Sequence, residues 1–458
     1  MTEKSLIGAD KIILGLTGSI GSGCTYIAEG ISNYYPKYKY FCLSDTLKHI
    51  AKERGISKPT VEQLQELGNS LRAEHGNSYL VQKTLETVEK SPDIDSCDGI
   101  IIDSIRNDFE VQTLRQFPYF YLFSIHADQT IRCERTLKMK KFATNDEFYK
   151  ADERDQSEDI PFGQQVIRCN DLADIIINNN KHIAKQATTT KKQFIDSIYN
   201  KYLELIESKK KGKLTPENLP SIDETLMTMS YAESQRSSCL KRKVGAVIAS
   251  IKTFSKSDPD KAIKESVNVI SSAHNEVPYG AIPCIFHPEF EKCYRDYLQE
   301  NQAQKIKNCP NCGEKINFHV IKCNNCKSEY STYLKVCPEC KRELEVKYFC
   351  PKCNTNIFKE YLLSGGKLLD MCRALHAEEN AILNLSKISY KNSDELVLYT
   401  TTYPCNLCAN KIVTAGIKKI VYADPYPMKE AKKILDAGGV ITEKFQGIKS
   451  SAFFKLYR

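Results

Sequence analysis

The chain contains a histidine and a glutamate two residues apart, His376 and Glu378, and a later unit Pro404-Cys405-x-x-Cys408. One histidine and two cysteines can supply three ligands to a tetrahedral zinc ion, which leaves a fourth position for water. Glu378 lies two residues after the histidine, so it can serve as the catalytic general acid and base without being a ligand. The order and spacing predict a catalytic zinc site, with a purely structural site as the alternative.

The segments around these residues indicate a family: SSCLKRKVGAVIAS, SSAHNEVP, CRALHAEENAIL and TTYPCNLCANKIVTAGIKKIVY. Together with the H-x-E and P-C-x-x-C halves, about 150 residues of the chain resemble deoxycytidylate deaminases of the zinc cytidine deaminase superfamily. The resemblance implies an α/β/α layered domain with a mixed five-stranded sheet and a homo-oligomeric assembly. It also implies zinc-dependent hydrolysis of dCMP, dCTP or both to deoxyuridine nucleotides and ammonia.

The same resemblance implies three residues that contact the substrate. Asn275 stands where the family places an asparagine that hydrogen-bonds the nucleoside, although HNEVP departs from the usual G-Y-N-G-x-P and leaves the loop shape open. The Ala377 N–H and the Tyr403 carbonyl are expected to read the cytosine edge. The Tyr403 side chain could equally be a packing group.

A phosphate-binding loop is predicted near the amino terminus. The residues from Gly18 to Thr25 follow the apolar run KIILGLT and fit G-x-x-x-x-G-K-[ST] except at Cys24, where the motif has lysine. Backbone N–H groups in such a loop cradle phosphate, and Thr25 could bind Mg²⁺ with the Walker-B-like Asp103. The predicted nucleotide-binding residues are Gly18, Ser19, Gly21, Ser22, Gly23, Cys24, Thr25 and Asp103.

Cys24 favours binding over turnover, because the missing lysine would stabilise phosphoryl transfer. With FCLSDTLK, ADIIINN and a pair of arginines, the block resembles small P-loop nucleotide and dephospho-coenzyme A kinases over about 170 residues. Arg106, Arg132 and Arg135 could each be a phosphate contact or a surface ion pair. The alternative for the loop itself is a tight glycine turn without a ligand.

Four C-x-x-C pairs predict two structural zinc ribbons, because four thiolates close a tetrahedral site. Pairing of sequence neighbours is favoured over interleaving, which the spacing leaves open. The pairs are Cys309/Cys312, Cys323/Cys326, Cys337/Cys340 and Cys350/Cys353.

The ribbons have a second candidate role. From Lys305 to Cys353 there are ten Lys and Arg against five Asp and Glu, with aromatic residues interspersed. This composition could bind RNA or DNA, including an inhibitory RNA, since lysines meet phosphates and aromatic rings stack bases. An oligomer contact or a lid beside the active site is the alternative.

A third structural zinc is implied by the resemblance, since some deoxycytidylate deaminases place one in this region. Its candidate ligands are Cys284, His287, Cys293 and Cys372, and free buried cysteines are the alternative. The cysteines without partner spacing are expected to be small core residues. They are Cys42, Cys97, Cys133, Cys169 and Cys239.

The composition of the 458 residues fits a multidomain globular protein, with 41% hydrophobic residues, 27% charged residues and a net charge of +8. No apolar run approaches a membrane span, and a cytoplasmic location is expected. The predicted division is a P-loop kinase-like domain at 1–208, a linker at 209–221 and a deaminase-like domain at 222–458. The zinc-ribbon insertion is placed at 305–356.

Short β-branched runs alternate with helical patterns from about residue 11 to residue 180: KIILGL, KYKYFCL, GIIID, PYFYLFSI and ADIIINN. This alternation predicts a parallel sheet with crossover helices, and the pattern becomes polar and helical after residue 180. The predicted fold class is α/β, a parallel-sheet kinase-like domain joined to a cytidine deaminase-like layered domain. This union resembles bacterial anti-phage dCTP/dCMP deaminases. The resemblance implies that the first domain binds a regulatory nucleotide, ATP or a deoxynucleotide, and that dCTP depletion restricts phage. The competing hypotheses are a working nucleotide kinase with a deaminase-like appendage and a deaminase acting on RNA or DNA.

Overall fold

The computed structural model describes residues 10–92, 94–156, 163–180, 190–215, 218–254, 264–290, 292–298, 308–309, 311–315, 321–322, 329–330, 350, 352–353, 371–386, 395–425 and 429–458. The chain forms two compact units. One consists of Met1–Ala232, Val247–Ser271 and Ser389–Arg458, and the other of Glu233–Ala246 and Ser272–Ile388. Within the described parts, no helix combines the length and apolar character that crossing a membrane requires.

The amino-terminal block is built on a six-stranded sheet with the strand order β13-β5-β4-β1-β3-β2. Its five amino-terminal strands pair in parallel and coincide with the apolar runs that predicted them. Apart from the half-buried edge strand β2, they are buried on both faces, as crossover sheets require. They are β1 (Ile12–Thr17), β2 (Tyr38–Cys42), β3 (Gly99–Ile105), β4 (Phe120–His126) and β5 (Ile175–Asn178).

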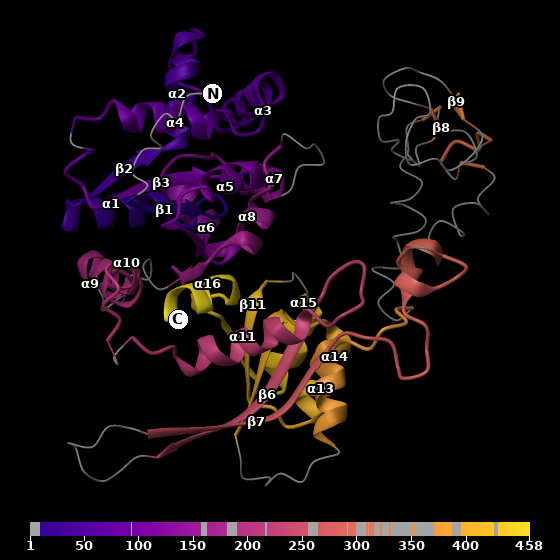
Figure 1. Cartoon of the computed structure of the whole chain (residues 1–458). Helices are drawn as coiled ribbons and strands as arrows, with labels where there is room; N and C mark the ends of the chain where they lie inside the picture. Colours follow the sequence, from indigo (N-terminus) through magenta and orange to yellow (C-terminus); the bar gives the residue numbers. More distant parts are fainter. Residues whose placement is uncertain are drawn as a thin grey trace. The chain divides into compact units, whose positions relative to one another are not determined.

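Helices connect and cover these strands (Figure 1). They are α1 (Cys24–Tyr34), α2 (Leu43–Glu53), α3 (Val61–His75), α4 (Tyr79–Glu89), α5 (Asp108–Leu114), α6 (Gln129–Lys138), α7 (Asn145–Gln156), α8 (Val166–Leu172), α9 (Lys191–Ile198), the π-helical turn η1 (Tyr199–Leu203) and α10 (Glu204–Lys210). The last three form the polar helical stretch expected after residue 180, and their apolar faces pack into the core beside β1 and β4.

The carboxy-terminal end of the chain completes the same sheet. The short strand β13 (Gly447–Ile448) pairs antiparallel with β5, and α16 (Ser450–Tyr457) buries Ala452 and Leu456 in the amino-terminal core, beside α10. Glu224 is fully buried at this junction and accepts hydrogen bonds from the Ile448 N–H and the Tyr457 hydroxyl. Nothing in the amino-acid pattern predicted this pairing.

A five-stranded sheet with the order β12-β11-β10-β6-β7 confirms the second predicted α/β element. Its strands are β6 (Gly245–Phe254), β7 (Lys264–His274), β10 (Leu396–Thr402), β11 (Lys419–Asp424) and β12 (Ile441–Lys444), of which the last three pair in parallel. Its helices are α11 (Ile222–Ser234), α13 (Ala377–Leu385), α14 (Asn406–Thr414) and α15 (Lys429–Ala437).

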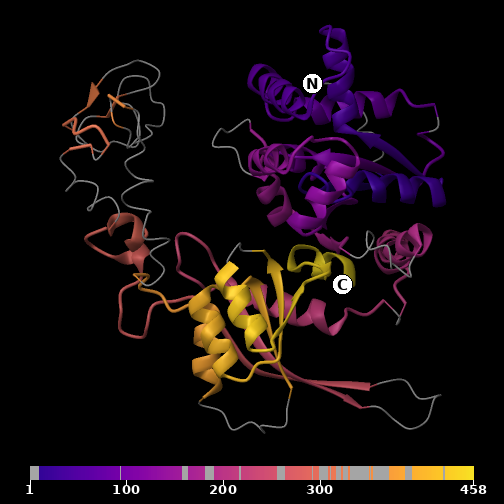
Figure 2. The same cartoon turned by 180° about the vertical axis from the view of Figure 1, so that it is seen from behind.

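Helix α11 crosses one face of this sheet in Figure 1 and lies behind it in the opposite view of Figure 2. Leu226 and Met227 of α11 pack against Val247, Tyr399 and other strand residues, which gives the sheet one of its two covered faces. The cysteine-rich segment contains the short helix η2 (Cys284–Phe286) and the antiparallel strands β8 (Ile321–Lys322) and β9 (Glu329–Tyr330).

Candidate functional site

Both halves of the predicted catalytic motif begin helices. His376 is the amino-terminal cap of α13, and Cys405, which follows the end of β10 by a short turn, is the cap of α14. Cys408 lies in the first turn of α14 and is fully buried. One potential ligand atom from each of these three residues lies within 4.8 Å of the other two. One imidazole and two thiols this close fit the donor set of a catalytic zinc site.

The helix amino termini also suit a site for a cation held by thiolates. The partial positive charge at the start of α14 interacts favourably with negative charge on groups placed there, as Cys405 and Cys408 are. Glu378, in the first turn of α13, is buried at 4% exposure, and Ala377 before it is fully buried. The chain therefore places a carboxylate in a water-poor position two residues from the histidine ligand, as the sequence predicts.

Asn275 is engaged by the backbone of a neighbouring segment. Its Oδ1 accepts a hydrogen bond from the Val244 N–H at 2.7 Å, and its Nδ2 donates to the Arg242 carbonyl at 3.0 Å. The Ser237 hydroxyl donates to the Asn275 carbonyl at 2.7 Å. These hydrogen bonds show that Asn275 helps to hold the segment around residues 242–244 in place. The contact between Asn275 and the substrate stays a prediction.

The Tyr403 side chain is a packing group in this structure. It is buried, and its ring meets the ring of Tyr422 edge-on with centroids 4.8 Å apart. The Tyr403 N–H donates to the Asp424 carbonyl at 2.9 Å, which ties the turn before Cys405 to β11. A substrate contact through the Tyr403 carbonyl remains a prediction.

The phosphate loop adopts the strand–loop–helix form that its motif predicts. It leads from β1 to α1, with Gly23 as the helix cap at φ 101°. A Cβ at Gly23 would lie 2.3 Å from Nδ2 of Asn179, so both the backbone angle and the space require glycine. The Thr25 hydroxyl donates to the Asp103 carboxylate at 2.7 Å. These two oxygens lie together, as a shared Mg²⁺ would require.

Arginines hold this loop through its carbonyl groups. Buried Arg132 donates to the Ile20 carbonyl at 3.0 Å, and buried Arg135 donates to the Gly21 and Ser22 carbonyls at 3.2 Å. Arg132 also makes a buried ion pair with Asp152, and Arg135 also donates to the Asn179 carbonyl. Neither side chain is therefore a surface ion pair, and both support the loop from within the core.

Arg106 and Asn179 complete the support. Arg106 pairs with buried Asp155, whose other oxygen accepts the Ile20 N–H at 3.0 Å. Asn179, which the sequence did not single out, donates from Nδ2 to the Ser22 carbonyl at 2.7 Å. An asparagine just after an apolar strand is too common a pattern to have identified it.

Cys24 does not replace the missing lysine electrostatically. Burial, together with the nearby Asp103, raises the pKa of the Cys24 thiol from 9.0 to about 12. Burial likewise raises the pKa of Asp103, although hydrogen bonds from Thr25 and the Ser104 N–H oppose the shift. At neutral pH the position of the lysine therefore holds an uncharged thiol.

The cysteine-rich insertion corrects the favoured ribbon pairing. Cys309, Cys312, Cys350 and Cys353 have sulfur atoms that all lie within 4.8 Å of one another. The first and last C-x-x-C pairs thus share one site, because the chain between them returns to its starting point. Cys323, Cys326, Cys337 and Cys340 lie outside the described residues.

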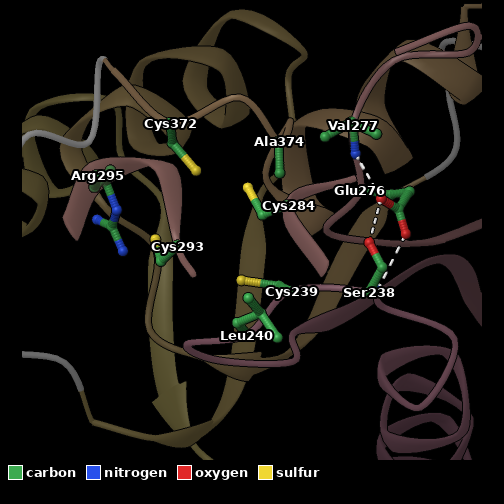
Figure 3. A pocket seen from close by; sticks show the side chains of 10 residues that line it. All are labelled: Ser238, Cys239, Leu240, Glu276, Val277, Cys284, Cys293, Arg295, Cys372 and Ala374. Atoms are coloured by element: carbon green, nitrogen blue, oxygen red, sulfur yellow. Dashed lines mark hydrogen bonds between the residues drawn. The ribbon is translucent and has the colours of Figure 1, made fainter. Parts of the chain in front are cut away.

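A separate pocket gathers four further thiols (Figure 3). Cys284, Cys293 and Cys372 line it as the sequence grouped them, but the fourth cysteine is Cys239, which had been assigned to the core. His287 does not line the pocket, and its ring stacks on Phe290 with centroids 3.9 Å apart. Only spatial neighbourhood identifies Cys239, because no C-x-x-C spacing marks it.

Arg295 lies beside these thiols. Burial lowers the pKa of its guanidinium, but Cys293, Cys372 and Cys239 outweigh burial and raise it. A cation facing several sulfur atoms would offset the negative charge that they carry as thiolates.

Known proteins resemble both halves of the chain. Residues 220–424 match the family described as the cytidine and deoxycytidylate deaminase zinc-binding region. The deoxycytidylate deaminase of Schizosaccharomyces pombe is 25% identical over 358 residues, 77% of this chain and 79% of that protein. A UPF0200 protein of Methanocaldococcus jannaschii is 24% identical over 208 residues, 45% of this chain and 99% of that protein.

Among solved structures, dCMP deaminase from the cyanophage S-TIM5 is 21% identical and has a TM-score of 0.24, covering 51% of this chain and 99% of that chain. Taken with the described geometry, the family match and the relatives support one conclusion. The chain joins a parallel-sheet block that carries a phosphate-loop motif to a region, residues 220–424, that is similar to the zinc-binding region of cytidine and deoxycytidylate deaminases.

Proposed function

We propose that this protein is a zinc-dependent deaminase of deoxycytidine nucleotides, dCMP, dCTP or both, whose phosphate-loop block binds a nucleotide and regulates it. The observation that carries the proposal is the cluster of half-buried His376 with buried Cys405 and Cys408 at two helix amino termini, with buried Glu378 in the first turn of α13. The similarity to deoxycytidylate deaminases supports the substrate class.

The roles of the residues follow from their chemistry. His376, Cys405 and Cys408 would hold zinc, which when bound supplies the Lewis acidity that activates water. Glu378 would accept the proton from water, deliver it to the cytosine ring nitrogen and then assist the departure of ammonia. Burial of the carboxylate keeps bulk water away from this proton transfer.

The test is a substrate panel with full-length, zinc-loaded protein. dCTP, dCMP, dCDP and cytidine are incubated with and without ATP, dTTP and total cellular RNA, and formation of uracil nucleotides and ammonia is followed. The proposal expects deamination of at least one deoxycytidine nucleotide. Zinc-loaded protein that deaminates none of them under any condition would contradict it.

A nucleotide kinase is the second candidate, and the intact pair of Thr25 and Asp103 favours it. The neutral Cys24 thiol opposes it, because phosphoryl transfer needs positive charge at that position. Transfer of labelled phosphate from ATP to nucleosides or monophosphates would establish kinase activity.

We further propose that depletion of dCTP by this protein restricts phage. A phage-plating assay that compares the native protein with the Glu378→Gln variant tests this role, and equal protection by both would contradict it.

We also propose that the pocket of Cys239, Cys284, Cys293 and Cys372 holds a structural zinc ion, which would draw together four thiols whose sulfur atoms do not all lie within 4.8 Å of one another in this structure. Cys239→Ser is then expected to lower the zinc content by one ion per chain, whereas His287→Ala leaves it unchanged. An unchanged zinc content in Cys239→Ser would leave the four thiols as free core cysteines.

A further inference from the structure

The junction between β5 and the carboxy-terminal segment links the phosphate loop to the turn before Cys405. At one end of β5, Asn179 donates its side-chain amide to the Ser22 carbonyl at 2.7 Å and its backbone N–H to the His126 carbonyl at 2.8 Å. Arg135 donates to the Asn179 carbonyl as well as to the loop. The end of β5 and the phosphate loop are therefore bound into one hydrogen-bonded unit.

The next contact leads out of this block. The N–H of Asn178, the last residue of β5, donates to Oε1 of Gln446 at 3.3 Å. Gln446 directly precedes β13, whose Gly447 and Ile448 pair with Ile176 and Ile175. A shift of β5 along its axis would therefore be passed to residues 446–448 through both backbone and side-chain hydrogen bonds.

The residue before Gln446 belongs to the core of the second sheet. Phe445 is buried, packs with Tyr399 and Val421, and donates its N–H to the Tyr422 carbonyl at 2.8 Å. Ile176 of β5 lies in the same apolar cluster, so β5 contacts this core directly as well. Close-packed interiors transmit such displacements because they contain little free volume.

The last contact reaches the proposed metal site. The Tyr422 ring meets the Tyr403 ring edge-on, and Tyr403 precedes Pro404 and the ligand Cys405 by one and two residues. The Tyr403 N–H is held by the Asp424 carbonyl of the same strand as Tyr422. Movement of β11 would thus move the turn that carries the Cys405 thiol.

We propose that a nucleoside triphosphate bound at the phosphate loop controls deamination through this junction, with Asn179 and Gln446 as positioning residues. The inference rests on the proposed function, since it assigns a route to the regulation proposed there. Phosphate oxygens accept hydrogen bonds, so a phosphate ligand engages backbone N–H groups of the loop and of the start of α1 other than that of Ile20, which donates to Asp155. The loop carbonyls are held by Arg132, Arg135 and Asn179. Binding then shifts the same backbone segment that Asn179 connects to β5.

If the two sites are coupled, binding of the triphosphate changes the affinity for the deoxycytidine nucleotide, and the reverse must hold by the same factor. This change in affinity can be measured without any turnover. In full-length, zinc-loaded Glu378→Gln protein, the affinity for dCMP and dCTP is measured by calorimetry with and without ATP or dTTP and magnesium. The reciprocal affinity for the triphosphate is measured with and without dCMP. Coupling is expected to change each affinity by about five-fold or more, by the same factor in both directions.

Variants at Gln446 test the route. Gln446→Ala removes the acceptor for the Asn178 N–H and is expected to reduce the coupling factor by up to about five-fold, the worth of one hydrogen bond. Each ligand alone should bind as before, because exposed Gln446 is in neither site. Gln446→Glu retains an oxygen acceptor and should preserve the coupling, and Gln116→Ala, at an exposed glutamine after α5, is the matched control.

The inference is overturned if triphosphate binding leaves the affinity for the deoxycytidine nucleotide unchanged, or if the coupling persists undiminished in Gln446→Ala. Absence of triphosphate binding at the loop would also overturn it. These failures are distinguishable from failure of the proposed function, because deamination by the protein with native Glu378 is assayed separately with the substrate panel.

Discussion

The phosphate loop and the His376–Cys405–Cys408 cluster both use helix amino termini, but they use them differently. The loop before α1 presents backbone groups, held from behind by Arg132, Arg135 and Asn179, and its characteristic side-chain position is filled by an uncharged thiol. The cluster instead presents side chains from the starts of α13 and α14.

The His376–Cys405–Cys408 cluster has every side chain of its motif, whereas the phosphate loop has the backbone of its motif but lacks the lysine. A backbone cradle can still hold phosphate after a side chain is replaced, because its N–H groups remain. A metal site made of side chains loses a ligand when any one of them is replaced, and the backbone does not supply another. We therefore expect substitutions to affect the two regions very unequally.

Cys408→Ala should have the largest effect. It removes one of three ligands, so zinc content is expected to fall by one ion per chain and deamination to become undetectable. Triphosphate binding at the phosphate loop should persist. Metal analysis, the substrate panel and calorimetry check the three parts, with Cys133→Ala at a buried cysteine outside the proposed metal sites as control. Full activity in Cys408→Ala would remove the cluster from catalysis.

Glu378→Gln should lower the deamination rate by about 10²–10⁴-fold, the usual contribution of a general acid and base. Its zinc content should stay at the wild-type level because Glu378 is not a proposed ligand. The neighbouring Glu379→Gln makes the same chemical change and should remain active. Loss of zinc from Glu378→Gln would show that the carboxylate is a metal ligand or a structural support.

Cys24→Lys should increase the affinity of the phosphate loop for ATP, because it restores the lysine of the motif. A lysine beside bound phosphate adds a charge-assisted hydrogen bond, so affinity for ATP is expected to rise by about ten-fold or more. Cys24→Met, a neutral side chain of comparable length, should not show this gain. Calorimetry at two salt concentrations measures it. Equal affinities in the lysine and methionine variants would argue against phosphate binding at this loop.

The pH dependence of Cys24 alkylation should have the smallest consequence for function. The thiolate is the reactive form, and the pKa of this thiol is raised from 9.0 to about 12 by burial and by Asp103. At pH 10 the folded protein therefore keeps the thiol largely protonated, whereas in the denatured chain about nine-tenths of it is ionised. The alkylation rate should rise by about ten-fold per pH unit up to about pH 11 in the folded protein and should level off at about pH 10 in the denatured chain. Peptide mass spectrometry measures both rates, and levelling off at about pH 10 in the folded protein would contradict the shift.

The strands and motifs were predictable because they depend on local patterns. Apolar runs predicted β1 to β5, and the spacing of His376, Cys405 and Cys408 predicted a cluster that the fold assembles. The replacement of lysine by Cys24 was visible in the motif. The loss of charge at that position needs no tertiary information, because a cysteine carries no positive charge in any environment.

The amino-acid sequence specifies which chemical groups are available and which local elements carry them. Which distant groups come together was visible only in the folded chain: Cys309 and Cys312 with Cys350 and Cys353, Cys239 with Cys372, and β13 with β5. Identical thiols have no preference for sequence neighbours, and a two-residue strand has no periodicity that could identify its partner. Their partners are selected by the packing of the whole chain.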